Sequence, residues 1–233
     1  SSVSSLPFFL PPTPVSNTDA PIAHDSAPSQ NKSISEWFNI TKRLVDEHPL
    51  KPEQIVSSVL TSWIQIFESK IGPLSIGKEI FPPPQIMSNI IHELIPYNLS
   101  TSVSSDYRVG KTKKEKDIVY IHDDQFSIEV KASSSKNDIY ANRSYAQPSL
   151  DSDTKNKNGY YIGVNFEKFQ KDGEDYRQVE YSEGVLVYPK ITKIRFGYLD
   201  HKDWVPQKSA KGQQARLTKE AKQYKFLKLY NSI

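Results

Sequence analysis

Residues 117–131 read DIVYIHDDQFSIEVK, in which two runs of β-branched and aromatic residues are separated by a short polar stretch. Two such runs predict two strands joined by a turn, which is an antiparallel hairpin. In the second strand, alternation places Glu129 and Lys131 on one face and Ile128 and Val130 on the other. The apolar face can enter a core, so the carboxylate and the amine share the open face.

The register of this hairpin decides whether Asp117 joins that open face. Directly opposed residues of an antiparallel pair share a face. If the turn centres on Asp124, Asp117 lies opposite Lys131. A turn of even length would place Asp117 on the other face unless a bulge corrected it. We therefore predict that Asp117, Glu129 and Lys131 converge.

The triplet Glu129-Val-Lys131 is one of three Glu-x-Lys triplets in the chain. The other two, Glu68–Lys70 and Glu220–Lys222, lie in helical patterns, where residues two apart point about 200° from each other. Only the strand triplet can present both side chains to one site.

Two neighbouring carboxylates repel each other unless a cation neutralises them, and hard oxygen ligands suit Mg²⁺ or Mn²⁺. A lysine beside such an ion can orient or deprotonate a water molecule, while the ion stabilises charge on a phosphate. The hairpin therefore predicts metal-dependent hydrolysis of a phosphodiester.

Asp117, a gap of eleven residues and then Glu129-Val-Lys131 resemble the signature of the PD-(D/E)xK nucleases, with Lys116 in the place of the proline. The resemblance implies Mg²⁺, for which Mn²⁺ can substitute, held by Asp117, Glu129 and the carbonyl of Val130. It implies that Lys131 acts on the water.

Many such nucleases place a further acid on the helix before the hairpin. Glu93 is the match in position and is a tentative fourth metal ligand, although a glutamate on the surface of a helix is the commoner explanation.

The segments IEVKASSSKNDIYANRSYAQ, residues 128–147, and FGYLDHKDWVPQKSAKGQQARL, residues 196–217, are similar to type II restriction endonucleases of the ScaI-like group. This resemblance implies cleavage of double-stranded DNA at a specific, palindromic sequence. A two-fold sequence is matched by a two-fold protein, so we expect a homodimer. Alternatives are a junction resolvase or repair nuclease of the same architecture, or a DNA-binding module without activity.

The pattern along the chain is helical before the hairpin and extended after it. Apolar spacing predicts helices from Ser35 to His48, over 53–71, over 85–94 with an end at Pro96, and over 217–230, with a candidate helical crossing at 137–147. Strands are predicted at 117–121, 126–130, 160–166, 184–188 and 191–198.

This order favours an α/β or α+β fold with a mixed central sheet flanked by helices, as in restriction endonucleases. We expect an extended or disordered arm over 1–33 and one nuclease domain over 34–233. Within it, 34–96 form a helical part, a candidate dimer contact, and 97–233 form the catalytic sheet and a DNA-contacting end.

Two polar segments are candidates for DNA contact, because arginine suits guanine edges and asparagine or glutamine suits adenine edges. Capping and ordinary solvation explain them equally well. The candidates are Asn142, Arg143 and Gln147 after the hairpin, and Lys208, Lys211, Gln213, Gln214 and Arg216 near the end.

Composition excludes several classes of protein. The chain has no cysteine, which excludes disulfides and thiolate metal sites. No apolar run approaches the roughly 18 residues of a membrane span, so we expect a soluble, cytoplasmic protein without a membrane partner. The net charge of +3 alone does not indicate a nucleic-acid partner. His92, His122 and His201 lack ligand spacing and are expected as surface or capping residues.

Overall fold

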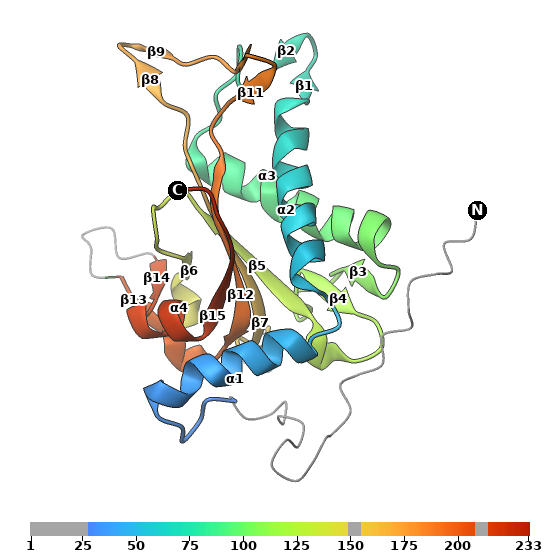
Figure 1. Ribbon diagram of the computed structural model, residues 1–233, viewed down its shortest axis with the longest axis vertical. Coiled ribbons are helices and arrows are strands. Elements are labelled where there is room, and N and C mark those ends of the chain that lie inside the picture. The colour runs from blue at the N-terminus through green and yellow to red at the C-terminus, as the bar shows by residue number, and fades with distance from the viewer. Residues whose placement is uncertain (1–27, 149–154, 208–213) are drawn as a thin grey trace.

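The computed structural model describes residues 28–148, 155–207 and 214–233 (Figure 1). Most of the predicted arm, residues 1–27, lies outside this range, and residues 28–31 form a turn that leads into the first helix.

A six-stranded mixed sheet forms the centre of the molecule, as the sequence predicts. The strand order is β15-β12-β7-β5-β4-β3, in which β5 and β7 are parallel and all other neighbours are antiparallel. The strands are β3 (Tyr107–Val109), β4 (Ile118–Tyr120), β5 (Ile128–Ser133), β7 (Gly159–Phe166), β12 (Ile191–Leu199) and β15 (Phe226–Asn231).

Both faces of this sheet are covered, which explains why every residue of β7 is buried. Three helices supply the main core with Val59, Trp63 and Ile91 among others. They are α1 (Ile34–Glu47), α2 (Pro52–Phe67) and α3 (Pro84–Asn98), and Figure 1 shows α1 crossing one end of the sheet. Because this core continues from α1 to β12, we still propose one domain over 34–233.

A smaller sheet and a short helix cover the second face. This sheet has the order β13-β14-β6 and packs around Trp204 and Tyr145. Its elements are β6 (Tyr140–Asn142), β13 (Trp204–Pro206) and β14 (Gln214–Leu217), with α4 (Lys219–Tyr224) beside them.

The predicted helix boundaries need correction at three ends. The cap of α1 is Ser33, whose backbone N–H donates to Glu36 Oε2 at 2.9 Å, so the helix begins at Ile34. α2 ends at Phe67, because the following residues pair as the hairpin β1 (Lys70–Ile71) and β2 (Leu74–Ser75). The first Glu-x-Lys triplet, Glu68–Lys70, therefore lies beyond the helix, and its predicted helical position is wrong.

The sequence predicts that the third helix ends at Pro96, but α3 continues through this proline to Asn98. The ring of Pro96 is buried and costs the helix one hydrogen bond. Asn98 Nδ2 anchors this last turn to α2 by donating to Ser62 Oγ at 2.9 Å and to Gln65 Oε1 at 2.7 Å. A π-helix, Leu99–Val103, follows.

The predicted last helix, 217–230, is wrong for more than half of its length. Only Lys219–Tyr224 is helical, and Phe226–Asn231 forms the edge strand β15 beside β12. A Cβ at Gly197 of β12 would overlap the carbonyl oxygen of Lys225, so a glycine is needed where the chain enters the sheet.

Two other elements also differ from prediction because partners distant in sequence decide them. The candidate helical crossing at 137–147 contains β6, which pairs with β14, and a 3₁₀ helix, Arg143–Ala146. The strand at 184–188 is β11 (Val185–Val187), which pairs only with β10 (Glu180–Ser182) outside the central sheet. A further hairpin joins β8 (Lys171–Asp172) to β9 (Asp175–Tyr176).

Within the described residues, no helix has the length and apolar character that crossing a membrane requires.

His48 fixes the end of α1 to the turn of the hairpin and should make the fold sensitive to acid. Its ring is fully buried, Nδ1 accepts from Leu50 N at 3.0 Å and Nε2 donates to the Phe126 carbonyl at 3.1 Å. The neutral ring satisfies both bonds, and burial lowers the pKa of His48 to about 3.

The unfolded chain gains a proton at His48 below about pH 6.5, whereas the folded chain does not. Stability is therefore complete above that pH and is lost as the pH falls toward 3. We expect a loss of about 2 kcal/mol between pH 7.5 and pH 5 from this residue. Urea unfolding at both pH values measures it, with His48→Gln as the comparison. An equal loss in the variant would exclude His48 as the source.

Candidate metal centre

The hairpin forms, but its turn is centred one residue before the predicted centre, Asp124. Ile118 pairs with Ile128, and the same register carried one residue further sets Asp117 opposite Glu129 rather than Lys131. A 3₁₀ helix, Asp124–Phe126, makes the turn. Because the shift changes the pairing by two residues, Asp117 stays on the predicted face.

Asp117 and Glu129 lie together and are almost completely buried. Asp117 Oδ2 accepts from the backbone N–H of Val130 at 2.8 Å, which fixes the carboxylate against the neighbouring strand. The side chain of Asp117 is 10% exposed and that of Glu129 is 2% exposed. Two buried carboxylates in contact demand a positive partner.

His92 of α3 completes this group. Its Nε2 lies 2.9 Å from Asp117 Oδ2, and ligand atoms of His92, Asp117 and Glu129 all lie within 4.8 Å of one another. The prediction that His92 is merely a surface or capping histidine is wrong, whereas His122 does lie away from the cluster and pairs with Asp106 at 2.8 Å.

Glu93, the tentative ligand, is exposed and is absent from this cluster of described residues. The buried stripe of α3 runs through Met87, Ile91 and Ile95. His92 is rotated by about 100° from that stripe and Glu93 by about 200°. The smaller rotation of His92 from the buried stripe was the sequence signal that could have favoured His92 over Glu93 as the side chain that reaches the hairpin. Glu93 does line a small cavity of about 120 Å³ that Asp117 shares.

The pKa values of the two carboxyl groups are shifted in opposite directions. Burial, followed by the hydrogen bond with Asp117 and its charge, raises the pKa of Glu129 to about 7. Burial alone would raise the pKa of Asp117, but hydrogen bonds from His92 and Glu129 hold it well below its ordinary value. The bond to Asp117 in turn raises the pKa of His92. The pair is therefore poised to exchange a shared proton for a cation.

Two cations and a phenol surround the pair. Lys155 Nζ lies 2.8 Å from Glu129 Oε2 and 3.7 Å from Asp117 Oδ1. Tyr145 donates from its hydroxyl to Glu129 Oε2 at 3.3 Å, and the Lys131 ammonium lies 4.2 Å from the centroid of the Tyr145 ring. Burial lowers the pKa of Lys131. Sequence patterns gave no signal for Lys155 or Tyr145, because tertiary folding alone brings them to the hairpin.

These donors fit a divalent cation. Two carboxylates provide the oxygen ligands that Mg²⁺ and Mn²⁺ prefer, and the imidazole adds a nitrogen that Mn²⁺ tolerates. A divalent cation that displaced the proton shared by the two buried carboxyl groups would have a clear electrostatic role there.

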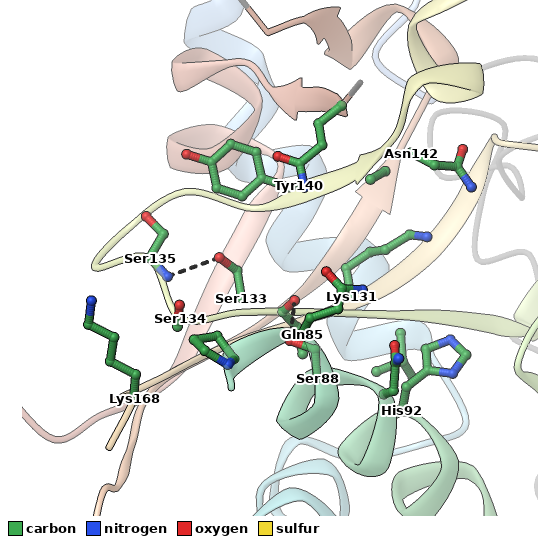
Figure 2. Close-up of a pocket in the computed structure, with 16 residues that line it drawn as sticks. Gln85, Ser88, His92, Lys131, Ser133, Ser134, Ser135, Tyr140, Asn142 and Lys168 are labelled. Atoms are coloured by element: carbon green, nitrogen blue, oxygen red, sulfur yellow. Dashed lines mark hydrogen bonds between the residues drawn. The ribbon is translucent and has the colours of Figure 1, made fainter. Parts of the chain in front are cut away.

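A polar cleft of about 780 Å³ opens beside this centre, between α3 and β6. Figure 2 shows Gln85, Ser88 and His92 on the helix, Tyr140 and Asn142 on the facing segment, and Lys131 between them. Gln214 also lines the cleft.

The predicted DNA-contacting residues divide into three groups. Asn142 and Gln214 are exposed in the cleft, where they are paired across β6 and β14. Arg143 and Gln147 are exposed nearby but do not line the cleft, and Arg216 borders another cavity with Tyr140. The other three, Lys208, Lys211 and Gln213, lie outside the described residues.

A mixed sheet that carries a buried carboxylate pair and a lysine on two adjacent strands, next to an open polar cleft, defines the class of the PD-(D/E)xK nucleases. Comparison with known proteins identifies the family. The model of the ScaI restriction endonuclease family matches residues 27–230, and the chain belongs to this family.

Among curated proteins, type II restriction enzyme ScaI of Streptomyces caespitosus is 42% identical over 183 residues, which cover 78% of this chain and 75% of that protein. No solved structure matches significantly.

Proposed function

We propose that this protein is a type II restriction endonuclease that hydrolyses phosphodiester bonds of double-stranded DNA at a specific, palindromic sequence, with Mg²⁺ as cofactor and as a homodimer. Family membership and the similarity to a type II restriction enzyme support site-specific cleavage. The convergence of Asp117, Glu129 and His92 within 4.8 Å supports the dependence on a metal.

In this proposal Asp117, Glu129 and His92 hold the ion, with the Val130 carbonyl as a further ligand. When bound, the ion polarises the scissile phosphate and acidifies a water molecule. Lys131 orients the attacking water and accepts its proton, for which burial has lowered the pKa of the lysine. Tyr145 positions Lys131 through its ring and Glu129 through its hydroxyl.

Incubation of the protein with a long DNA duplex and Mg²⁺, followed by sequencing of the fragment ends, tests the proposal. We expect discrete fragments whose ends share one sequence with two-fold symmetry, and none when EDTA is present. Cleavage of branched DNA alone would instead support a junction resolvase. Binding without any cleavage would support the inactive DNA-binding module.

The proposed dimer is tested separately by light scattering after size exclusion. The chain has a mass of 26.6 kDa, so a homodimer has twice that mass. A monomer that stays monomeric on the cleaved duplex would contradict the dimer but not the nuclease.

Replacing Tyr145 by Phe should reduce the rate of cleavage about tenfold, because a hydrogen bond to a charged group is lost while the ring under Lys131 remains. Tyr145→Leu removes both contacts and should reduce the rate further. Single-turnover rates measure both effects, with Tyr176→Phe on the exposed β9 as the control. A wild-type rate for Tyr145→Phe would show that the hydroxyl does not position Glu129.

A further inference from the structure

The cleft beside the metal centre has the chemistry of a surface that reads nucleobases. Among the described residues, its lining contains Lys131, Lys168 and His92 but no aspartate or glutamate. It also contains four carboxamide side chains, all of them exposed: Gln85, Asn89, Asn142 and Gln214. A carboxamide presents one donor and one acceptor side by side, which matches the edge of adenine in the major groove.

The four carboxamides form two pairs on opposite walls. Gln85 and Asn89 are four residues apart on α3 and therefore lie on one face of the helix. Asn142 and Gln214 are directly opposed in the pairing of β6 with β14. Among the described residues, none forms a hydrogen bond with the side chain of Gln85, Asn89 or Gln214, so their polar atoms are available to a ligand.

The wall formed by α3 is fixed to the catalytic strand. Ser88 Oγ, between the two carboxamides in sequence, donates to the carbonyl of Ala132 in β5 at 3.3 Å. One turn further along, His92 contacts Asp117. The helix that presents Gln85 and Asn89 therefore also carries His92, a candidate metal ligand. A small displacement of α3 at the two carboxamides would also move His92.

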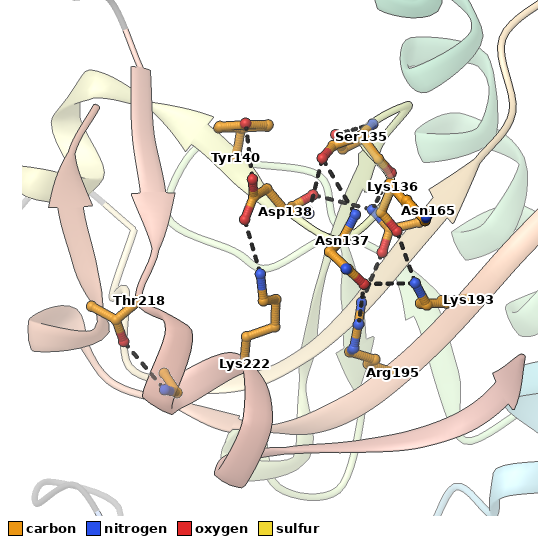
Figure 3. Close-up of polar contacts among 12 residues, drawn as sticks. Ser135, Lys136, Asn137, Asp138, Tyr140, Asn165, Lys193, Arg195, Thr218 and Lys222 are labelled. Atoms are coloured by element: carbon orange, nitrogen blue, oxygen red, sulfur yellow. Dashed lines mark hydrogen bonds and ion pairs between the residues drawn. The ribbon is translucent and has the colours of Figure 1, made fainter. Parts of the chain in front are cut away.

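The opposite wall is held by polar contacts behind it, which centre on the buried side chain of Asn165 (Figure 3). Asn165 Nδ2 donates to the carbonyls of Ser135 and Asp138 at 3.0 and 3.1 Å, and Arg195 Nη1 donates to Asn165 Oδ1 at 2.8 Å. Lys193 Nζ donates to Asn137 Oδ1 at 2.6 Å. These bonds fix the segment that leads into β6, so Asn142 is presented from a rigid support.

We propose that Gln85 and Asn89 determine sequence specificity by contacting base edges of the bound duplex, with adenines as their targets, across the cleft from Asn142 and Gln214. This inference rests on the proposed function, because it assigns the recognition step of the same reaction. α3 then couples recognition to chemistry through His92.

The test compares cleavage rates on the sequence that the wild-type protein cuts with rates on duplexes that differ from it by one base pair. We expect Gln85→Ala and Asn89→Ala each to cut the original sequence about 10- to 100-fold more slowly. Each should also lose most of its discrimination at one or two A·T positions and retain it elsewhere. Tyr97→Ala, exposed on α3 and outside the cleft, should behave as the wild type.

Binding gives a second readout that needs no chemistry. With Ca²⁺ in place of Mg²⁺, fluorescence anisotropy should show the same loss of discrimination for the two variants, and thermal melting identifies any variant that is unfolded. For a variant that does not fold, Gln85→Met or Asn89→Leu replaces it, because either removes the carboxamide with little change of volume and adds no charge that would repel DNA.

The inference is overturned if the wild-type protein cuts one sequence and the two variants either cut every duplex equally more slowly or discriminate between duplexes as the wild type does. If the wild-type protein cuts no duplex at all, the proposed function fails instead.

Discussion

Replacing Asp117 by Asn should reduce the single-turnover rate of DNA cleavage about 10²- to 10³-fold. Asp117 carries the negative charge of the carboxylate pair, since its pKa is held low by His92 and Glu129 although burial opposes this. Asparagine has nearly the same shape and can still accept the hydrogen bond from Val130 N. The variant therefore removes the charge and leaves the hairpin intact, and the loss of one preorganised electrostatic contact of this kind has effects of that size.

The matched control for this variant is Asp123→Asn. Asp123 lies in the turn of the same hairpin and caps the 3₁₀ helix, a position where asparagine serves equally well. We expect the control to cut at a rate within a few-fold of the wild type. Circular dichroism and thermal melting should show both variants folded. Undiminished cleavage by Asp117→Asn would place the active site elsewhere.

Replacing Lys131 by Met should reduce cleavage about 10²- to 10⁴-fold, the range for loss of a general acid or base. Burial lowers the pKa of Lys131. At a given pH this lysine is therefore neutral more often than an exposed lysine, and the neutral amine can accept a proton. Lys131→Arg keeps a positive charge but cannot transfer a proton at neutral pH. If proton transfer is the role of Lys131, the arginine variant should be almost as defective as the methionine variant.

Lys136→Met is the control for the lost charge, because Lys136 is exposed five residues further along the chain and lies outside the metal centre. Cleavage rates measured against pH separate the two roles of Lys131. Recovery of most activity in Lys131→Arg would show that the lysine acts as a fixed charge rather than as a base.

The sequence predicted the face shared by Asp117, Glu129 and Lys131 because a strand alternates with a period of two, and this parity survives a change in the position of the turn. The mixed sheet and the three N-terminal helices were predicted for the same reason, since their periodic patterns are local.

Other features depend on contacts between distant segments and could not be predicted. The edge strand Phe226–Asn231 exists because β12 offers it a partner, and β6 exists because β14 does. Lys155 reaches Glu129 from 26 residues away. His92 is the exception, because the helical phase of α3 was sufficient to favour it over Glu93.

The interpretation depends on Asp117 and Glu129 holding a divalent ion, and a calorimetric titration of Mn²⁺ measures this without reference to activity. The protein is titrated with its cleaved sequence bound as a duplex that carries a non-hydrolysable linkage at the cut position. We expect Mn²⁺ to bind the wild-type complex, and to bind at least about tenfold more weakly when Glu129 is replaced by Gln. Equal Mn²⁺ affinity in the two proteins would contradict a metal centre at this hairpin.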